Sequence, residues 1–345
     1  MAAKPTGSSA GCTQLKKDLK EKRLGSFYIL SGEEDYLRRY YLDEMKKQLL
    51  DELTESFNFH RLTNETFSLQ SLSDALQALP MMAERSMVLL EDVNLFECDD
   101  TETLTALLND VPPECCLVVH VGEFKPDKRK KKLWEAIEKN AVLADFAYQS
   151  ETDLRPWIAR HFRSAGKQIA PELCTYLLQQ CGLSMTRLHG EILKICAYSG
   201  ADTIVRSDID AVVEPTLEAV VFQITDALGQ RDFGRALERL NVLLKLQTEP
   251  IPIVAAIGAQ MRRLYAAKLL QNAGKSAEAL SSLCGIAPYA ATKTMQQSRR
   301  VSERFCRRAV EHCCRTDYQI KTSYDDPERL TELLILTLAE EAGRD

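Results

Sequence analysis

The sequence predicts an α/β domain built on a parallel sheet, followed by two all-helical domains. In residues 1–149 short apolar runs alternate with helical patterns, and strands that alternate with helices form parallel sheets covered on both faces. From residue 150 the strand signals fade, and beyond Pro215 the pattern is wholly helical. We therefore expect domains at residues 1–149, 150–214 and 215–345, which suits a chain of 345 residues.

The composition is that of a soluble globular protein. Hydrophobic residues make up 45% of the chain and charged residues 27%. A net charge of −6 argues against a protein that holds nucleic acid by bulk electrostatics. The N-terminus lacks an apolar signal segment, and no apolar run is long enough for a membrane span. We expect a cytoplasmic protein without membrane contact, and no fixed structure in the first twenty residues.

The eleven cysteines do not form a metal-binding pattern. There is no Cys-x-x-Cys pair, and His312 beside Cys313 has no second pair at a recognised spacing. Cys174 and Cys181 lie seven residues apart, as do Cys306 and Cys313, so each pair shares a helix face. We expect them to be reduced, buried thiols, and we expect no metal and no cofactor.

The first strand, turn and helix have the layout of a phosphate-binding loop without its residues. That loop reads G-x-x-x-x-G-K-[ST]. Counting from Gly32, the later positions hold Leu37, Arg38 and Arg39. Leu37 does not permit the close backbone approach that a glycine allows. The acidic residues 33–35 would repel phosphates, although they favour the start of a helix. The sequence predicts a degenerate loop that binds no nucleotide.

The remaining elements of the first domain follow from hydrophobic periodicity. The expected strands are residues 27–30, 57–62, 87–90, 117–121 and 145–148, and the expected helices are residues 36–50, 69–79, 101–108 and 131–139.

Two adjacent methionines stand between the second of these helices and the next strand. Pro80 should end the helix near Leu79, and the strand begins at Met87. Met81 and Met82 therefore lie in a short connection. They could fold back and fill gaps in the core, because methionine adapts to irregular packing. They could instead form a flexible apolar plug for a partner's pocket. Spacing alone leaves both interpretations open.

One dense basic cluster precedes the last helix of the first domain. Its members are Lys125 and residues 128–132, and Asp127 is a candidate cap for the helix. Lys128, Arg129 and Lys130 could contact phosphates of DNA. The cluster could also be a solvated helix face, because no aromatic residues interleave with it to stack on bases.

The rest of the chain reads as helices with short connections, without a recognised catalytic motif. Asp232 and Ser302 are candidate helix caps. The expected helices are residues 154–162, 171–180 and 185–198, a short helix opened by Ser207, and then residues 217–228, 233–246, 250–273, 276–283, 288–298, 302–324 and 327–341.

With these residues in view, the chain resembles the delta subunit of the bacterial DNA polymerase III clamp loader. The resemblance rests on the order and spacing of several short segments. These are residues 28–34 with Tyr36-Leu37, residues 79–90, residues 124–134, Val221-Phe222 with Asp226-Ala227, and Asp317 with Ile320-Lys321.

The resemblance implies an AAA+-like α/β domain without a working phosphate loop, a helical lid domain and a helical collar domain. In that family an apolar pair plugs a pocket on the ring-shaped sliding clamp (beta), and the ring opens for loading on primed DNA. The matching positions here are Met81 and Met82, with Leu79 beside them, where family members often carry Leu and Phe. The implied partners are the clamp, the ATP-binding tau/gamma subunits, the delta-prime subunit and primed DNA.

The resemblance also implies a chain without an active site of its own, a subunit of a DNA-directed DNA polymerase holoenzyme. Arg187, near the position of a phosphate-sensing arginine in true ATPases, is then structural. Two alternatives remain. An active AAA+ ATPase would need the competent loop that Leu37, Arg38 and Arg39 replace. A delta-prime-type subunit would carry a Ser-Arg-Cys motif, which this sequence lacks.

Overall fold

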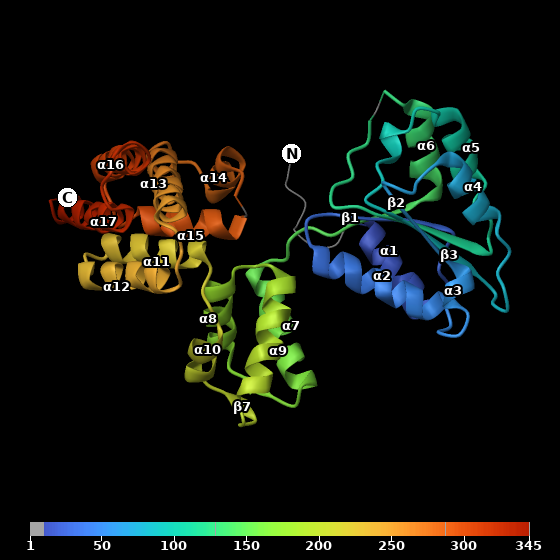
Figure 1. Ribbon diagram of the computed structural model, residues 1–345, viewed down its shortest axis with the longest axis horizontal. Helices are drawn as coiled ribbons and strands as arrows, with labels where there is room; N and C mark the ends of the chain where they lie inside the picture. The colour runs from blue at the N-terminus through green and yellow to red at the C-terminus, as the bar shows by residue number, and fades with distance from the viewer. Residues whose placement is uncertain (1–9, 128, 287, 345) are drawn as a thin grey trace. The chain divides into compact units, whose positions relative to one another are not determined.

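The computed structural model describes residues 10–344 except residues 128 and 287 (Figure 1). These residues divide into two compact units. The first unit consists of two segments, the chain up to Leu154 and Leu183–His189. The second contains Arg155–Gly182 and the chain from Gly190 onward.

The first unit is built on a five-stranded parallel sheet with the order β2-β3-β4-β1-β5. Every residue of the central strands β1 and β4 is buried, as expected for a parallel sheet covered on both faces. The strands are β1 (Phe27–Ser31), β2 (Phe59–Thr63), β3 (Ser86–Glu91), β4 (Cys115–His120) and β5 (Val142–Asp145).

Helices cover both faces of this sheet (Figure 1). Alternate strand residues belong to different cores: Ile29 packs in the core that includes residues of α4, α5 and α6, and Leu30 in the core that includes residues of α1 and α2. The helices are α1 (Ala10–Glu21), α2 (Asp35–Leu49), α3 (Glu55–Asn58), α4 (Leu69–Gln77), the 3-10 turn η1 (Leu95–Glu97), α5 (Thr101–Asn109) and α6 (Lys131–Asn140).

The expectation that the first twenty residues lack structure is wrong for residues 10–20. They form most of α1, which lies against β5, and the Leu15 side chain is fully buried. A Cβ atom on Gly11 would lie 1.9 Å from the carbonyl oxygen of Leu143, so only glycine permits this approach. Tyr28 also donates a hydrogen bond to the Asp18 carboxylate, at 2.8 Å. Residues 1–9 lie outside the described part of the chain.

Two predicted strands are shifted in the structure. The strand expected at residues 57–62 begins at Phe59, because the preceding residues form the short helix α3. The strand expected at residues 145–148 is found at Val142–Asp145, where it pairs with β1. Phe146 leaves the sheet, and its ring stacks on that of Tyr41 with the centroids 5.2 Å apart.

Beyond residue 150 the regular structure of the described residues is helical except for two short paired strands, β6 (Gln168–Ile169) and β7 (Thr203–Ile204). Asp232 and Ser302 cap helices as predicted, accepting hydrogen bonds from the amides of Arg235 and Phe305. The helices are α7 (Glu151–Ser164), α8 (Pro171–Cys181), α9 (Met185–Tyr198), α10 (Arg206–Val212), α11 (Leu217–Gly229), α12 (Phe233–Lys245), α13 (Pro250–Asn272), α14 (Ala277–Cys284), α15 (Pro288–Ser298), α16 (Glu303–Thr322) and α17 (Pro327–Gly343).

The cysteine pairs predicted to share a helix face are buried. Burial raises the pKa of the Cys174 thiol to about 11 and that of the Cys313 thiol to about 12. Both are therefore uncharged small hydrophobes at neutral pH. None of the helices in the described residues combines the length and apolar character that a membrane span requires.

Candidate functional site

The connection between α4 and β3, residues 78–85, exposes its apolar side chains to solvent; we call it the methionine turn. The exposed fractions are 86% for Leu79, 55% for Met81 and 95% for Met82. Helix α4 ends at Gln77, shortly before Pro80, as predicted. The exposure excludes the interpretation that both methionines fill gaps in the core.

The backbone of the methionine turn is held at two points. At its end, the Arg85 guanidinium donates to the carbonyl oxygens of Leu24, Gly25 and Cys115, at 2.6, 2.9 and 3.2 Å. Near its middle, the Met81 backbone bonds to the buried side chain of Asn58. Sequence reasoning missed Asn58, since residues 57–62 read as one continuous strand and a strand pattern assigns no such role to a side chain.

Two more apolar side chains are exposed in the segment that leads to Asn58. Leu53 and Phe57 are both largely in solvent. Phe57 precedes Asn58 in α3, and Asn58 contacts the turn, so Phe57 belongs to the same region of the surface. Scattered exposed hydrophobes are ordinary, but a gathering of them indicates a binding surface.

The β1–α2 loop, residues 32–34, lies where a phosphate loop would lie, and its own side chains fill it. Gly32 has φ +113°, and a Cβ there would lie 2.3 Å from the Phe146 carbonyl oxygen. Glu34 is buried and caps α2, accepting a 3.3 Å hydrogen bond from the Tyr36 amide. A carboxylate thus stands at the helix N-terminus, where phosphates bind in nucleotide-binding proteins. Burial raises the pKa of the Glu34 carboxyl above its ordinary value.

The residues at the later positions of the phosphate-loop pattern form contacts within the first unit. Arg38 is buried and donates to Asp35 at 3.0 Å, and its Nη1 lies 3.3 Å from His120 Nε2. Burial, and then the Arg38 charge, lower the pKa of His120. Because arginine only donates, Nε2 of this neutral histidine is the acceptor. Arg39 is exposed and pairs with Asp35 at 2.7 Å, and Leu37 packs against the core to which α1 and α2 contribute.

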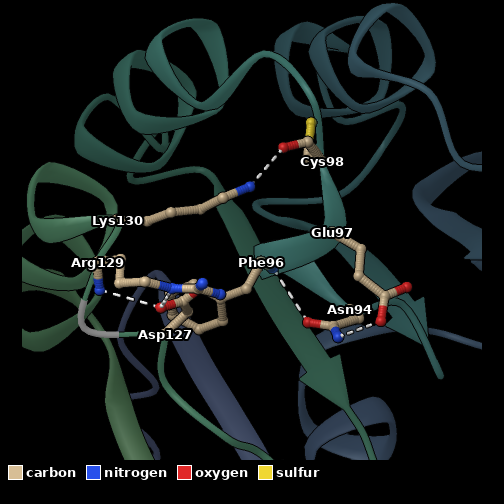
Figure 2. Close-up of polar contacts among 7 residues, drawn as sticks. All are labelled: Asn94, Phe96, Glu97, Cys98, Asp127, Arg129 and Lys130. Carbon is tan, nitrogen blue, oxygen red and sulfur yellow. Dashed lines mark hydrogen bonds and ion pairs between the residues drawn. The ribbon is translucent and has the colours of Figure 1, made fainter.

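The described members of the basic cluster lie on the loop between β4 and α6 and in the first turn of α6 (Figure 2). Lys128 lies outside the described residues. Arg129 pairs with Asp127 at 2.8 Å, and the Lys130 ammonium donates to the Cys98 carbonyl oxygen at 2.9 Å (Figure 2). The prediction that Asp127 caps α6 is wrong, because its carboxylate accepts from the Arg129 backbone and side chain instead.

The turn that receives Lys130 is itself fixed. Asn94 caps η1 by accepting from the Phe96 amide at 3.0 Å, and its own amide donates to Glu97 at 2.9 Å (Figure 2). Other members of the cluster also have acidic partners, Lys125 with Glu123 and Lys132 with Glu102.

Across the described residues, no group of three or more histidine, cysteine, aspartate or glutamate side chains is arranged to hold a metal ion.

Two family models match this chain. The model of the DNA polymerase III delta subunit matches residues 28–147, and that of the C-terminal domain of the same subunit matches residues 218–338. The chain belongs to the DNA polymerase III delta subunit family. The resemblance inferred from the sequence is therefore confirmed.

Individual relatives agree with this assignment. DNA polymerase III subunit delta of Bacillus subtilis is 25% identical over 332 residues, covering 93% of this chain and 95% of the relative. A probable DNA polymerase III subunit delta of Aquifex aeolicus is 21% identical over 269 residues, 75% of each chain.

A solved structure agrees with the fold. The Bacillus subtilis DNA clamp loader delta protein superimposes with a TM-score of 0.70 at 24% identity, covering 95% of this chain and 99% of that one. This match confirms the predicted fold class, a parallel α/β domain followed by helical regions.

Proposed function

We propose that this chain is the clamp-opening subunit of its clamp loader, and that it binds the ring-shaped sliding clamp through Leu79, Met81 and Met82. The observation that carries the proposal is the exposure of two adjacent methionines, 55% and 95%, on a turn whose backbone is held in place. Family membership supports the role, since the matching segment of delta subunits carries the apolar pair that binds the clamp.

The proposed mechanism is binding rather than catalysis. Burying two methionine side chains in a clamp pocket contributes about 1.5–3 kcal/mol each. Part of this offsets the loss of freedom on association. A wedge that binds the open ring better than the closed ring shifts the clamp population toward the open form. The ring is then placed on primed DNA by the assembled loader.

The other subunits supply the nucleotide chemistry in this proposal. The β1–α2 loop of this chain binds no ATP, because Glu34 takes the phosphate position and Arg38 is engaged with Asp35 and His120. ATP bound by the tau/gamma subunits exposes or hides the methionine turn. Residues 150–214 act as the lid, with Arg187 structural, and residues 215–345 act as the collar that joins the chain to tau/gamma and delta-prime. Arg129 and Lys130 contact DNA in the loader.

The deciding experiment introduces charge at the turn. Met81→Asp with Met82→Asp should weaken binding to the purified clamp by about 100-fold or more, because two buried apolar groups are replaced by carboxylates. The free energy of unfolding should stay within about 0.5 kcal/mol, since both side chains are exposed. Calorimetric titration and urea denaturation measure the two quantities.

A matched control adds the same charge elsewhere. Leu333 and Leu336 on α17 are also exposed, and Leu333→Asp with Leu336→Asp should leave clamp affinity unchanged. Unchanged affinity in the methionine variant would rule out the proposed plug. The competing ATPase function has its own test: micromolar binding of labelled ATP to the isolated chain would favour it.

A further inference from the structure

Asn58 connects a buried position to the most exposed part of the methionine turn. It is the last residue of α3, and its side chain is fully buried. Its Oδ1 accepts from the Met81 amide at 2.7 Å, and its Nδ2 donates to the Met81 carbonyl oxygen at 2.9 Å. One side chain thereby satisfies both backbone groups of a residue 23 positions later in the chain.

The residues around Asn58 are themselves held by contacts with α2 and β2. Glu55, in the first turn of α3, forms a 2.8 Å ion pair with Lys46 of α2. The same ammonium group lies 4.0 Å from the centre of the Phe59 ring, at the start of β2. The Asn58 amide also bonds to the Thr54 carbonyl oxygen at 3.2 Å. Asn58 is thus fixed relative to α2 and β2, and it transfers that fixed position to Met81.

The residue after Met81 has a backbone conformation that is unfavourable for residues other than glycine. Met82 has φ +53°, in the left-handed region that non-glycine residues rarely adopt. Its side chain is nevertheless exposed, so packing of the side chain does not account for the conformation. Strain of this kind persists only when the surroundings impose it, and it concentrates at functional sites.

We propose that Asn58 is a positioning residue that holds the methionine turn in its clamp-binding conformation before the clamp arrives. This inference rests on the proposed function. A turn that is ordered in advance avoids the entropy loss that a flexible segment would suffer on binding. When only a fraction of molecules has the competent conformation, the apparent dissociation constant rises in inverse proportion to that fraction.

The first test needs no substitution and no clamp. In the wild-type chain the Met81 amide should be protected from hydrogen exchange although the turn lies at the surface, because its acceptor is buried. Exchange at the rate of an unprotected amide would overturn the proposal. In Asn58→Ala the same amide should lose its protection.

The second test measures clamp binding. Asn58→Ala should weaken affinity about tenfold, the factor for a turn that is competent about a tenth of the time. If the alanine variant does not fold, Asn58→Asp takes its place in the test. This variant keeps the acceptor but loses the donor and places charge beside the Met81 carbonyl, so it should also weaken binding. Asn140→Ala is the control, because Asn140 donates to the Leu108 carbonyl oxygen and to Asn109 elsewhere in the first unit. Affinity within roughly twofold of wild type in folded Asn58 variants would overturn the proposal.

The third test asks whether Asn58 acts through the methionines. In a chain that already carries Met81→Ala and Met82→Ala, adding Asn58→Ala should cause little further loss of affinity. A further tenfold loss would show that Asn58 acts by another route. If Met81→Asp with Met82→Asp leaves clamp binding intact, the proposed function fails, whereas the exchange measurement still reports on the hydrogen bonds of Asn58.

Discussion

The methionine turn and the β1–α2 loop depart in opposite ways from the usual distribution of side chains. The turn exposes apolar residues, whereas the loop and the first turn of α2 bury charged ones, Glu34 and Arg38. The buried charges have partners in their own unit: the Tyr36 amide for Glu34, Asp35 and His120 for Arg38. The methionines instead leave apolar surface in water. The loop is thus filled by its own side chains, whereas the turn is held in place and left uncovered, as the proposed clamp-binding surface requires.

The largest expected effect concerns the backbone of the β1–α2 loop. Gly32→Ala should lower the free energy of unfolding by about 3 kcal/mol or more, because a Cβ would lie 2.3 Å from the Phe146 carbonyl oxygen at a φ of +113°. Urea denaturation measures the loss. Gly190→Ala, in α9 with nothing within 4 Å of the added atom, is the control and should be neutral or stabilising. A neutral Gly32→Ala would mean that the loop does not pack closely against the segment after β5.

The next effect separates affinity from stability in the methionine turn. Met82→Ala and Met82→Gly should both weaken clamp binding by about tenfold or more, because each removes the exposed apolar side chain. Met82→Gly should nevertheless be about 1 kcal/mol more stable than Met82→Ala, since glycine adopts the φ of +53° without strain. Calorimetry and denaturation on the same samples give both numbers. Equal stability of the two variants would argue against strain at this residue.

A smaller effect depends on pH and concerns the buried carboxyl group. Since the pKa of Glu34 is raised above its ordinary value, the chain loses stability as pH rises through the folded-state pKa. Glu34→Gln removes this loss, so it should be more stable than wild type at neutral pH. The gain should disappear as pH falls below the ordinary carboxyl pKa, where both states of the wild type bind the proton. Denaturation across that range tests the sign, and a gain that grows on acidification would contradict it.

The smallest effect concerns the basic cluster, in which Arg129 and Lys130 already have partners within the first unit. If Arg129 and Lys130 contact phosphates, Arg129→Gln with Lys130→Gln should lower the salt slope of DNA binding by the assembled loader, by about 0.9 for each phosphate that is no longer neutralised. Lys17→Gln with Lys20→Gln, on the exposed face of α1, is the control with equal charge change. An unchanged slope would leave the cluster as a solvated surface.

Much of the fold was predictable because it depends on patterns local to the chain. Pro80 stops a helix through its own geometry, and Asp232 and Ser302 cap helices through bonds to residues three positions later. The buried strands β1, β3 and β4 follow from apolar runs that need no knowledge of their partners. The degenerate character of the loop at Gly32 also follows from residue types alone.

Only the tertiary structure decided which side chains meet and which stay uncovered. The spacing of Met81 and Met82 allowed both a buried and an exposed arrangement, and the choice depended on what α3, α4 and β3 cover. Helix α1 packs against β5 through Leu15 and Gly11, and these two elements are more than a hundred residues apart in the chain. Asn58 and Met81 are likewise joined by folding. The physical reason is that exposure and long-range hydrogen bonds depend on how two distant segments of the chain pack together. Helix ends and strand periodicity depend on the residues of one segment alone.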